Sequence, residues 1–231
     1  MVREIDSLAS RSADGQLHAA SSMPDTSPVV GRRVIAPYVT SWSKEPTLVS
    51  TVVERPGVGI AYADEQLCDR DEHGVLWYRA PWRPEDGNPN FGDVHPVRQQ
   101  RAMRRLLCQV CAGPADRTDD GVLWLLKDHH DDWPGWPNGM GVSEPPVCRG
   151  CVGLSVRVCP ALRRGAVVVR AGSFRLAGVS GMAYRMWQGA PVPAGEVMVG
   201  FDDPQVRWVR AAHLIRRLND CTVVPIDTVT G

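Results

Sequence analysis

Short apolar runs separated by proline and glycine fill the first part of this 231-residue chain. Four of them have the length and composition of strands: residues 33–40, 47–53, 57–63 and 74–79. Runs of this kind are typical of antiparallel strands joined by tight turns. Residues 80–93 hold three prolines, two glycines and two asparagines, and predict a loop. This loop would close an N-terminal β-rich segment, residues 31–93. Residues 1–30 show no periodicity and predict a mobile arm.

A helical pattern begins after this loop. Asp93 is a suitable cap and Pro96 fits the first turn, so the pattern predicts a helix that runs to Leu107. The following residues predict a strand, a long loop and a short helix, in this order: 121–126, 127–144, and from Cys151 to before Pro160. Together these elements form a middle segment, residues 94–164.

The last segment, residues 165–231, predicts β structure and one helix. Two runs are of β type: 166–171 and 196–201. Asp203 as a cap and Pro204 at the first helical position predict a helix over residues 206–218. Its apolar positions recur at helical spacing: Trp208, Ala211, Ala212, Ile215 and Leu218. The last eleven residues predict an edge strand.

Two cysteine pairs carry the clearest chemistry in the sequence. Both have C-x2-C spacing, 36 residues separate them, and their members are Cys108 and Cys111, then Cys148 and Cys151. Two such pairs can surround one Zn²⁺ with a tetrahedron of thiolates, which predicts a four-cysteine zinc site. Four protein ligands leave no position for water, so the predicted role of Zn²⁺ is structural. Two unrelated reduced pairs or a redox dithiol are the alternatives, and Cys159 could substitute as a ligand.

Composition narrows the function classes. The formal net charge is zero, so no overall field attracts nucleic acid or a membrane surface. No apolar run is long enough to cross a bilayer, and we expect neither a membrane partner nor a dinucleotide cofactor. The cysteine usage favours metal over disulfides and therefore a cytoplasmic location. All but two of the 26 basic residues are arginine, which indicates a GC-rich genome such as that of an actinobacterium.

The helix before the first cysteine pair is rich in arginine. Arg98, Arg101 and Arg105 recur at helical spacing and predict one basic face, with Arg104 beside them. Such a face could contact the phosphates of DNA or RNA, or a protein partner. An ordinary solvated helix face is the alternative.

Residues 128–132 are all acidic or histidine. With the arginine-rich helix and the cysteine pairs, Asp128-His129 at the end of the predicted strand resembles HNH-type endonuclease modules with paired zinc knuckles, over about residues 98–154. The resemblance implies that Asp128 holds Mg²⁺ or Mn²⁺. It also implies that His129 or His130 is the general base that activates water on a phosphodiester. A solvated acidic loop and a non-catalytic metal site are the alternatives.

The resemblance stops after the second cysteine pair. The endonuclease family carries Asn or His there, where this chain has Val-Gly-Leu-Ser at residues 152–155. The Cys-Gln-Val-Cys and Trp-Pro-Gly-Trp-Pro surroundings are also similar to a group of uncharacterised small actinobacterial proteins, which implies a lineage and a metal but no activity.

The sequence therefore predicts an α+β fold. Short antiparallel strands would flank a treble-clef-like or zinc-ribbon-like four-cysteine module at residues 94–164. The leading function is a zinc-stabilised binding module that contacts nucleic acid or a protein and has no other activity assigned to it. A metal-dependent endonuclease using Asp128 and His129, and an accessory protein with purely structural zinc, are the alternatives.

Overall fold

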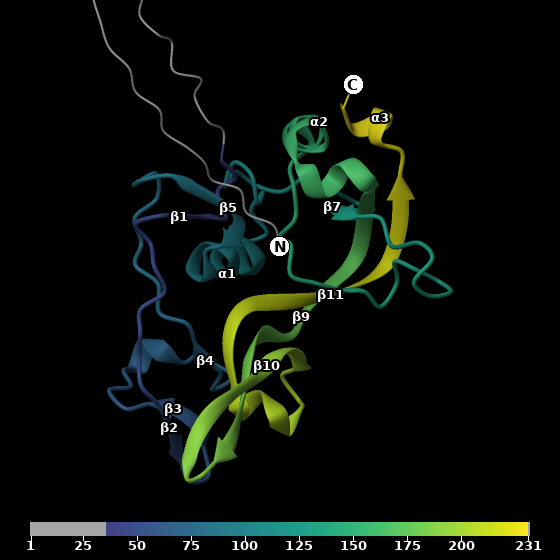
Figure 1. The fold of residues 1–231 in the computed structure, drawn as a ribbon. Coiled ribbons are helices and arrows are strands. Elements are labelled where there is room, and N and C mark those ends of the chain that lie inside the picture. The colour runs from purple at the N-terminus through teal and green to yellow at the C-terminus, as the bar shows by residue number, and fades with distance from the viewer. Residues whose placement is uncertain (1–35, 231) are drawn as a thin grey trace, which may run out of the picture. The chain divides into compact units, whose positions relative to one another are not determined.

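One long strand, β9 (Ala166–Trp187), forms the spine of the main sheet (Figure 1). Its partner along one edge is β11 (Val209–Val224). The other edge pairs first with β7 (Gly121–Lys127) and farther along with β10 (Ala190–Gly200). All three partners run antiparallel to β9. β9 therefore connects two ends of the sheet, one in which it pairs with β7 and one in which it pairs with β10.

The structure, a computed structural model, describes residues 36–230, so the predicted arm at residues 1–30 lies outside the described part. Three two-residue strands complete the main sheet: β4 (Leu76–Trp77), β6 (Arg117–Thr118) and β8 (Gly141–Val142). Helices and strands are both present, which confirms the α+β class. The main strands are much longer than the short ones that the sequence predicts.

Three α-helices and three short 3-10 segments accompany the sheets in residues 36–230: α1 (Pro96–Arg105), α2 (Arg149–Val158), α3 (Ile226–Thr230), η1 (Leu67–Asp69), η2 (Pro160–Arg164) and η3 (Pro204–Trp208). The helices predicted before the first cysteine pair and at the second are confirmed as α1 and α2. His95 caps α1 in place of Asp93, because its Nδ1 accepts the Arg98 amide at 3.4 Å. None of these helices is long and apolar enough to cross a membrane.

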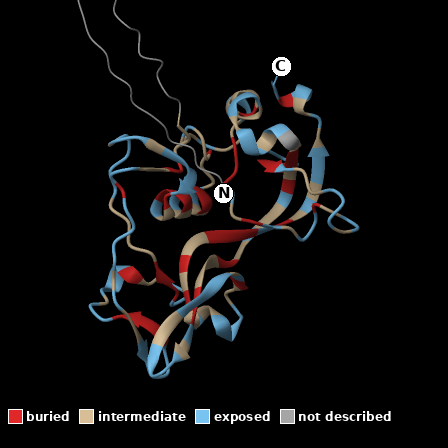
Figure 2. Cartoon of the chain, in the orientation of Figure 1, coloured by how far each residue is buried: buried red, intermediate tan, exposed pale blue. Residues whose placement is uncertain are grey.

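Residues of β7 are buried on both faces of the sheet. Trp124 and Leu126 pack on one face with valines of β9, under the loop that follows β7. Leu123 and Leu125 pack on the other face, against α2 and the first cysteine pair. A strand covered on both sides reads as a continuous apolar run, which is why its position is predictable from sequence. Figure 2 shows buried stretches along the sheet and on α1.

Two glycines allow β9 to lie very close to its neighbours. A Cβ added at Gly178 would lie 2.0 Å from the Val199 carbonyl oxygen, and one added at Gly181 would lie 2.2 Å from that of Arg210. β9 and β11 bend together in this part of the sheet (Figure 1), and their pairing is interrupted by two bulges. Glycine at these positions fits the close approach of backbone that a bent, bulged sheet requires.

The predicted helix over residues 206–218 is wrong. Asp203 does cap, accepting the Gln205 amide at 2.8 Å, but only the 3-10 segment η3 follows, and β11 begins at Val209. The bulges lie between Ala211 and His213 and between Ile215 and Arg216. The first bulge inserts Ala212 into β11 and shifts the alternation of that strand, whereas the second inserts Ala177 into β9. The shifted alternation in β11 gives a spacing of apolar residues that imitates a helix. Sheet pairing thus overrides the local signal. The strand predicted over the last eleven residues is partly correct, because residues 221–224 belong to β11, but α3 follows them.

Two smaller antiparallel pairs precede the main sheet: β1 (Thr40–Trp42) with β5 (Pro89–Val94), and β2 (Val52–Arg55) with β3 (Gly59–Tyr62). The β2–β3 hairpin confirms part of two predicted strands. The predicted loop at residues 80–93 is partly wrong, because β5 begins inside it. Pro89 opens β5, a position where proline costs no ladder hydrogen bond.

Candidate metal centre

The four predicted cysteines come together in space. The sulfur atoms of Cys108, Cys111, Cys148 and Cys151 all lie within 4.8 Å of one another. Cys111 and Cys148 Sγ are 3.7 Å apart. A metal–sulfur bond of about 2.3 Å makes the edge of a thiolate tetrahedron about 3.8 Å long. The group is therefore close enough to bind one metal ion. Cys159 is not part of it.

A tight turn after α1 presents the first pair. Leu106 ends the helix in the left-handed conformation, with φ of 52°. The Cys108 amide donates to the Gly113 carbonyl at 2.7 Å, and the Ala112 amide donates back to the Cys108 carbonyl at 2.9 Å. The Val110 amide points at Cys108 Sγ at 3.4 Å. Amides directed at sulfur stabilise a thiolate, so this turn favours the metal-binding form of the cysteine.

The start of α2 presents the second pair. Cys148 is the N-cap residue, and Cys151 lies in the first turn, where its amide donates to the Cys148 carbonyl at 3.0 Å. The N-terminus of a helix carries partial positive charge from its free amides. Both sulfurs are therefore held where negative charge is stabilised.

Backbone hydrogen bonds join the two pairs. The Gln109 amide, inside the first turn, donates to the Pro146 carbonyl at 3.0 Å. Val147, the next residue, donates to Leu123 of β7 at 2.9 Å and accepts from Asp116 at 3.0 Å. The segment before the second pair is thus hydrogen-bonded to β7 and to the first turn. Chain pairing brings together cysteines that are far apart in sequence.

Burial differs among the four thiols. Cys108 is fully buried, Cys148 and Cys151 are half-buried, and Cys111 is exposed. Burial raises the pKa of Cys108 to about 11 and raises the pKa of Cys151 further. Burial acts in the same sense on Cys111, but hydrogen bonds from the Gly113 amide and from the neighbouring thiols outweigh it and lower its pKa. A bound cation is the partner that lets several thiolates lie together.

The predicted catalytic residues lie in the exposed loop after β7 and pair with one another. Asp128 Oδ1 accepts from the His130 backbone amide at 3.0 Å and lies 2.9 Å from His130 Nδ1. His129 Nδ1 lies 3.1 Å from Asp132. The hydrogen bond to Asp128 raises the pKa of His130, and the same contact lowers the pKa of Asp128. A raised pKa favours the protonated form of His130, and this form cannot accept a proton.

No second metal-ligand group is formed by the described residues. The cysteine cluster is the one group of three or more His, Cys, Asp or Glu ligands that residues 36–230 bring within reach of an ion. Asp128 belongs to no such group, although His130 of the same loop lies beside it. The endonuclease role of Asp128 and His129 stays a prediction.

The predicted arginine face is divided by the structure. Arg98 is fully buried and forms an ion pair with Glu45, so it cannot contact a phosphate. Arg104 pairs with Asp71 and Glu72. Its charge is already neutralised by two carboxylates.

Arg101 and Arg105 remain exposed on α1. The helix leads directly into the first cysteine pair. These two residues are what is left of the predicted basic surface.

Sequence reasoning missed two hollows lined by residues from separate segments. A polar cleft of about 570 Å³ lies between the β1–β5 pair and the main sheet, and its ionisable lining residues are Glu45, Asp93, Glu196 and His213. Burial lowers the pKa of His213. A groove of about 450 Å³ is lined in part by Arg210 and Tyr184. Neither has a local motif, because each lining combines segments that lie 100 or more positions apart in the sequence.

The fold and the site define an α+β protein, mostly sheet, that carries a four-cysteine group able to bind a metal ion. No family model, no curated protein and no solved structure matches the chain. Function must therefore be inferred from the site.

Proposed function

We propose that the chain is a zinc-stabilised binding module in which Cys108, Cys111, Cys148 and Cys151 hold one structural Zn²⁺. The observation that carries the proposal is the mutual closeness of the four sulfurs, with one pair at 3.7 Å. Four thiolates in a tetrahedron are a ligand set that zinc prefers. They leave no open coordination position, so the ion has no catalytic role here.

The order of elements around the cysteines supports a treble-clef-like module. A cysteine turn comes first, the β6–β7 hairpin follows, and α2 begins at the second pair. When bound, Zn²⁺ cross-links the end of α1 to the start of α2. Three of the cysteines, Cys108, Cys148 and Cys151, pack with valines and leucines of β7 and α2 in one hydrophobic cluster. Structural zinc contributes on the order of 10 kcal/mol to folding, so the ion would hold this cluster together.

The binding surface that we propose is the exposed side of α1. Arg101 and Arg105 are solvent-exposed there, one turn apart, and the cross-link would fix the C-terminal end of their helix. Two guanidinium groups on one rigid helix suit the spacing of phosphates along a nucleic-acid strand. We infer that nucleic acid is the partner. If the chain does not bind nucleic acid, a protein partner is favoured instead.

Metal content tests the first part of the proposal. Protein purified without chelator should contain one zinc per chain by elemental analysis, and Cys148→Ser should abolish it. Cys221→Ser is the matched control, because Cys221 is a free thiol outside the group. Protein without bound metal, or equal metal loss in both variants, would overturn the proposal. Iron in place of zinc would overturn the identity of the ion.

Salt-dependent binding tests the second part. Fluorescence anisotropy with short single- and double-stranded DNA and RNA should detect an affinity that falls as salt rises. Arg101→Gln with Arg105→Gln should reduce the salt slope by about 2, because each lost phosphate contact removes nearly one counterion. Arg185→Gln with Arg207→Gln is the control, since both arginines are exposed elsewhere. No binding at low salt, or equal loss in the control, would reject nucleic acid as the partner.

A further inference from the structure

Arg210 of β11 carries a positive charge that the described residues do not neutralise with a carboxylate. Its guanidinium carbon lies 3.9 Å from the centre of the Tyr78 ring and 5.6 Å from that of Tyr184. Its Nη2 donates to the Tyr78 hydroxyl at 3.0 Å. Two aromatic rings and a neutral hydroxyl therefore surround the cation.

The arginine retains unused hydrogen-bonding capacity. Its Nε is buried and has no hydrogen-bond partner in residues 36–230. The Arg98 Nε is likewise buried without a partner, but the charge of Arg98 is neutralised by the Glu45 carboxylate, and Arg216 donates to the backbone carbonyls of Met103 and Phe174. Nη2 is the guanidinium nitrogen of Arg210 with a partner in the described residues, so Nη1, which is not among the buried unpaired atoms, keeps donors that an anionic ligand could use.

A groove of about 450 Å³ opens beside Arg210. Its walls are largely apolar and come from three separate parts of the chain: Leu48, Val49, Val52, Tyr184, Pro191 and Pro193. A hollow of this size suits a small molecule, since pockets for such ligands measure about 300–1,000 Å³. The lining combines apolar walls with one charged group, which is the usual composition of a small-molecule site.

The two prolines argue against an extended peptide as the occupant. Pro191 and Pro193 lie on β10, which pairs with β9 through its other edge. A peptide that added a strand to this edge would need backbone N–H donors there, and proline has none. The edge is therefore poorly suited to strand addition, and a small ligand remains.

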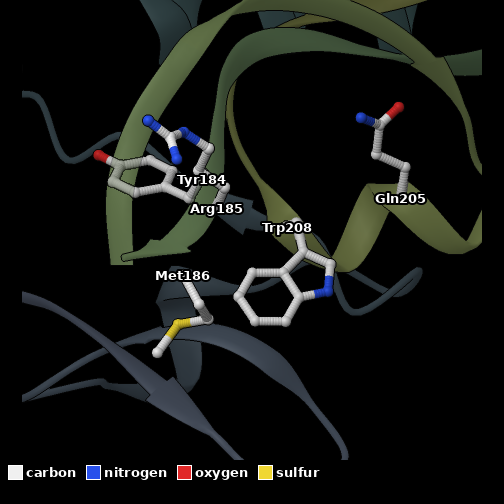
Figure 3. Close-up of a pocket in the computed structure, with 5 residues that line it drawn as sticks. All are labelled: Tyr184, Arg185, Met186, Gln205 and Trp208. Carbon is white, nitrogen blue, oxygen red and sulfur yellow. The ribbon is translucent and has the colours of Figure 1, made fainter. Parts of the chain in front are cut away.

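A second hollow that is also lined by Tyr184 is a weaker candidate. It measures about 300 Å³ and is lined by Met186, Gln205 and Trp208, with Arg185 (Figure 3). Figure 3 shows the Tyr184 hydroxyl pointing away from Met186 and Trp208. Arg185 is exposed and lies over the Trp187 ring at 5.2 Å, so its charge is solvated. Arg185 therefore provides the matched control for Arg210.

We propose that the groove beside Arg210 binds a small organic acid, with the carboxylate on the guanidinium and the apolar body against Leu48, Tyr184 and the β10 prolines. This site lies beyond the zinc-stabilised module and does not depend on it. Charge complementarity selects a carboxylate, and the walls select an apolar chain or ring.

Matched pairs of probes test the proposal on the full chain. Phenylacetate and hexanoate are compared with phenylacetamide and hexanamide by saturation-transfer NMR and calorimetry, with acetate as a probe of charge alone. The two acids should bind saturably, and their amides should bind at least about tenfold more weakly, because a charged hydrogen bond is lost. Acetate should also bind more weakly than hexanoate. Equal binding of acids and amides, or no binding of either acid, would overturn the proposal.

Variants place the site. Arg210→Gln should weaken phenylacetate binding at least about tenfold, and Arg185→Gln should leave it unchanged. Because Arg210 lies inside the sheet, a second pair avoids any effect on folding. Leu48 is 47% exposed, so Leu48→Glu and Leu48→Gln should both fold. The glutamate should compete for Arg210 and weaken binding, whereas the glutamine should not. Equal binding by these two variants would place the acid elsewhere and refute the assignment.

Discussion

The ion pair between Glu45 and Arg98 gives the sharpest test of the structure. Both side chains are fully buried, and Arg98 donates to the two carboxylate oxygens at 2.7 and 2.6 Å. The Arg83 and Trp42 amides donate to the same carboxylate at 2.7 and 3.0 Å. Arg98 also donates to the Thr40 carbonyl at 2.6 Å. The pair thus fixes α1 to the segment that follows β1.

Two independent arguments give the size of the effect. Burial alone would raise the pKa of Glu45, but the hydrogen bonds from Arg98 and the two amides outweigh it and hold the pKa at about 2, against an ordinary 4.5. Lowering a pKa by one on folding corresponds to about 1.4 kcal/mol, so the ionised Glu45 carboxylate stabilises the fold by roughly 3 kcal/mol. Removal of one partner from a buried ion pair costs about 3–5 kcal/mol. Glu45→Gln should therefore lower the free energy of unfolding by about 3 kcal/mol.

Urea unfolding at pH 7, followed by tryptophan fluorescence on metal-replete protein, measures this difference. Glu72→Gln is the control, because Glu72 pairs with Arg104 at the surface and such pairs contribute at most about 1 kcal/mol. The depressed pKa of Glu45 also sets the pH dependence. Its contribution is complete above about 4.5 and is lost as the pH falls toward 2, so wild type and Glu45→Gln should converge over that range. A loss at pH 7 no larger than that of Glu72→Gln would refute the reasoning.

Three further changes have expected outcomes. EDTA should lower the thermal unfolding midpoint of the wild-type protein, because it removes the metal. Cys108→Ser should abolish this effect of EDTA, whereas Cys159→Ser should keep it, and thermal melts with and without EDTA measure both. Arg216→Met should lower the free energy of unfolding by about 2 kcal/mol, because buried carbonyls lose their donor; a denaturant titration that finds no change would contradict this. Gly181→Ala should lower the free energy of unfolding by about 3 kcal/mol, because its Cβ would lie 2.2 Å from a carbonyl oxygen. Gly150→Ala is the control for the same titration and should be tolerated, because its Cβ would meet nothing within 4 Å.

The elements that the sequence predicts correctly are those whose local signal agrees with their packing in the fold. β7 is a continuous apolar run, and its predicted bounds differ from the observed ones by one residue. α1 has proline in its first turn, and α2 begins beside the second cysteine pair. The four metal ligands are predictable for the same reason. Two cysteines at C-x2-C spacing can be recognised as a ligand pair from their local sequence, and only the other pair lies far away along the chain.

Elements that depend on distant partners could not be predicted in this way. Residues 206–218 carry a capping signal and a helical spacing, yet sheet pairing with β9 determines their conformation. Arg98 sits on a helix with an arginine-rich sequence, but its carboxylate partner lies 53 positions earlier. Nothing near Arg98 in the sequence distinguishes it from Arg101. Burial is a property of the assembled fold, so a charge pattern alone could not separate the buried arginine from the exposed one.

The metal group and the Arg210 groove belong to different ends of one sheet. The first half of β9 pairs with β7 and packs in the cluster that contains Cys108, whereas the second half pairs with β10, two prolines of which line the groove. The residues around Tyr184 form a separate hydrophobic cluster. Loss of metal should therefore disorder the cysteine end first, and acid binding at Arg210 should persist in metal-free protein that keeps its sheet. If chelation abolished phenylacetate binding while the strand content stayed unchanged, the two ends would be coupled through β9, and the sheet would have to be treated as one cooperative unit.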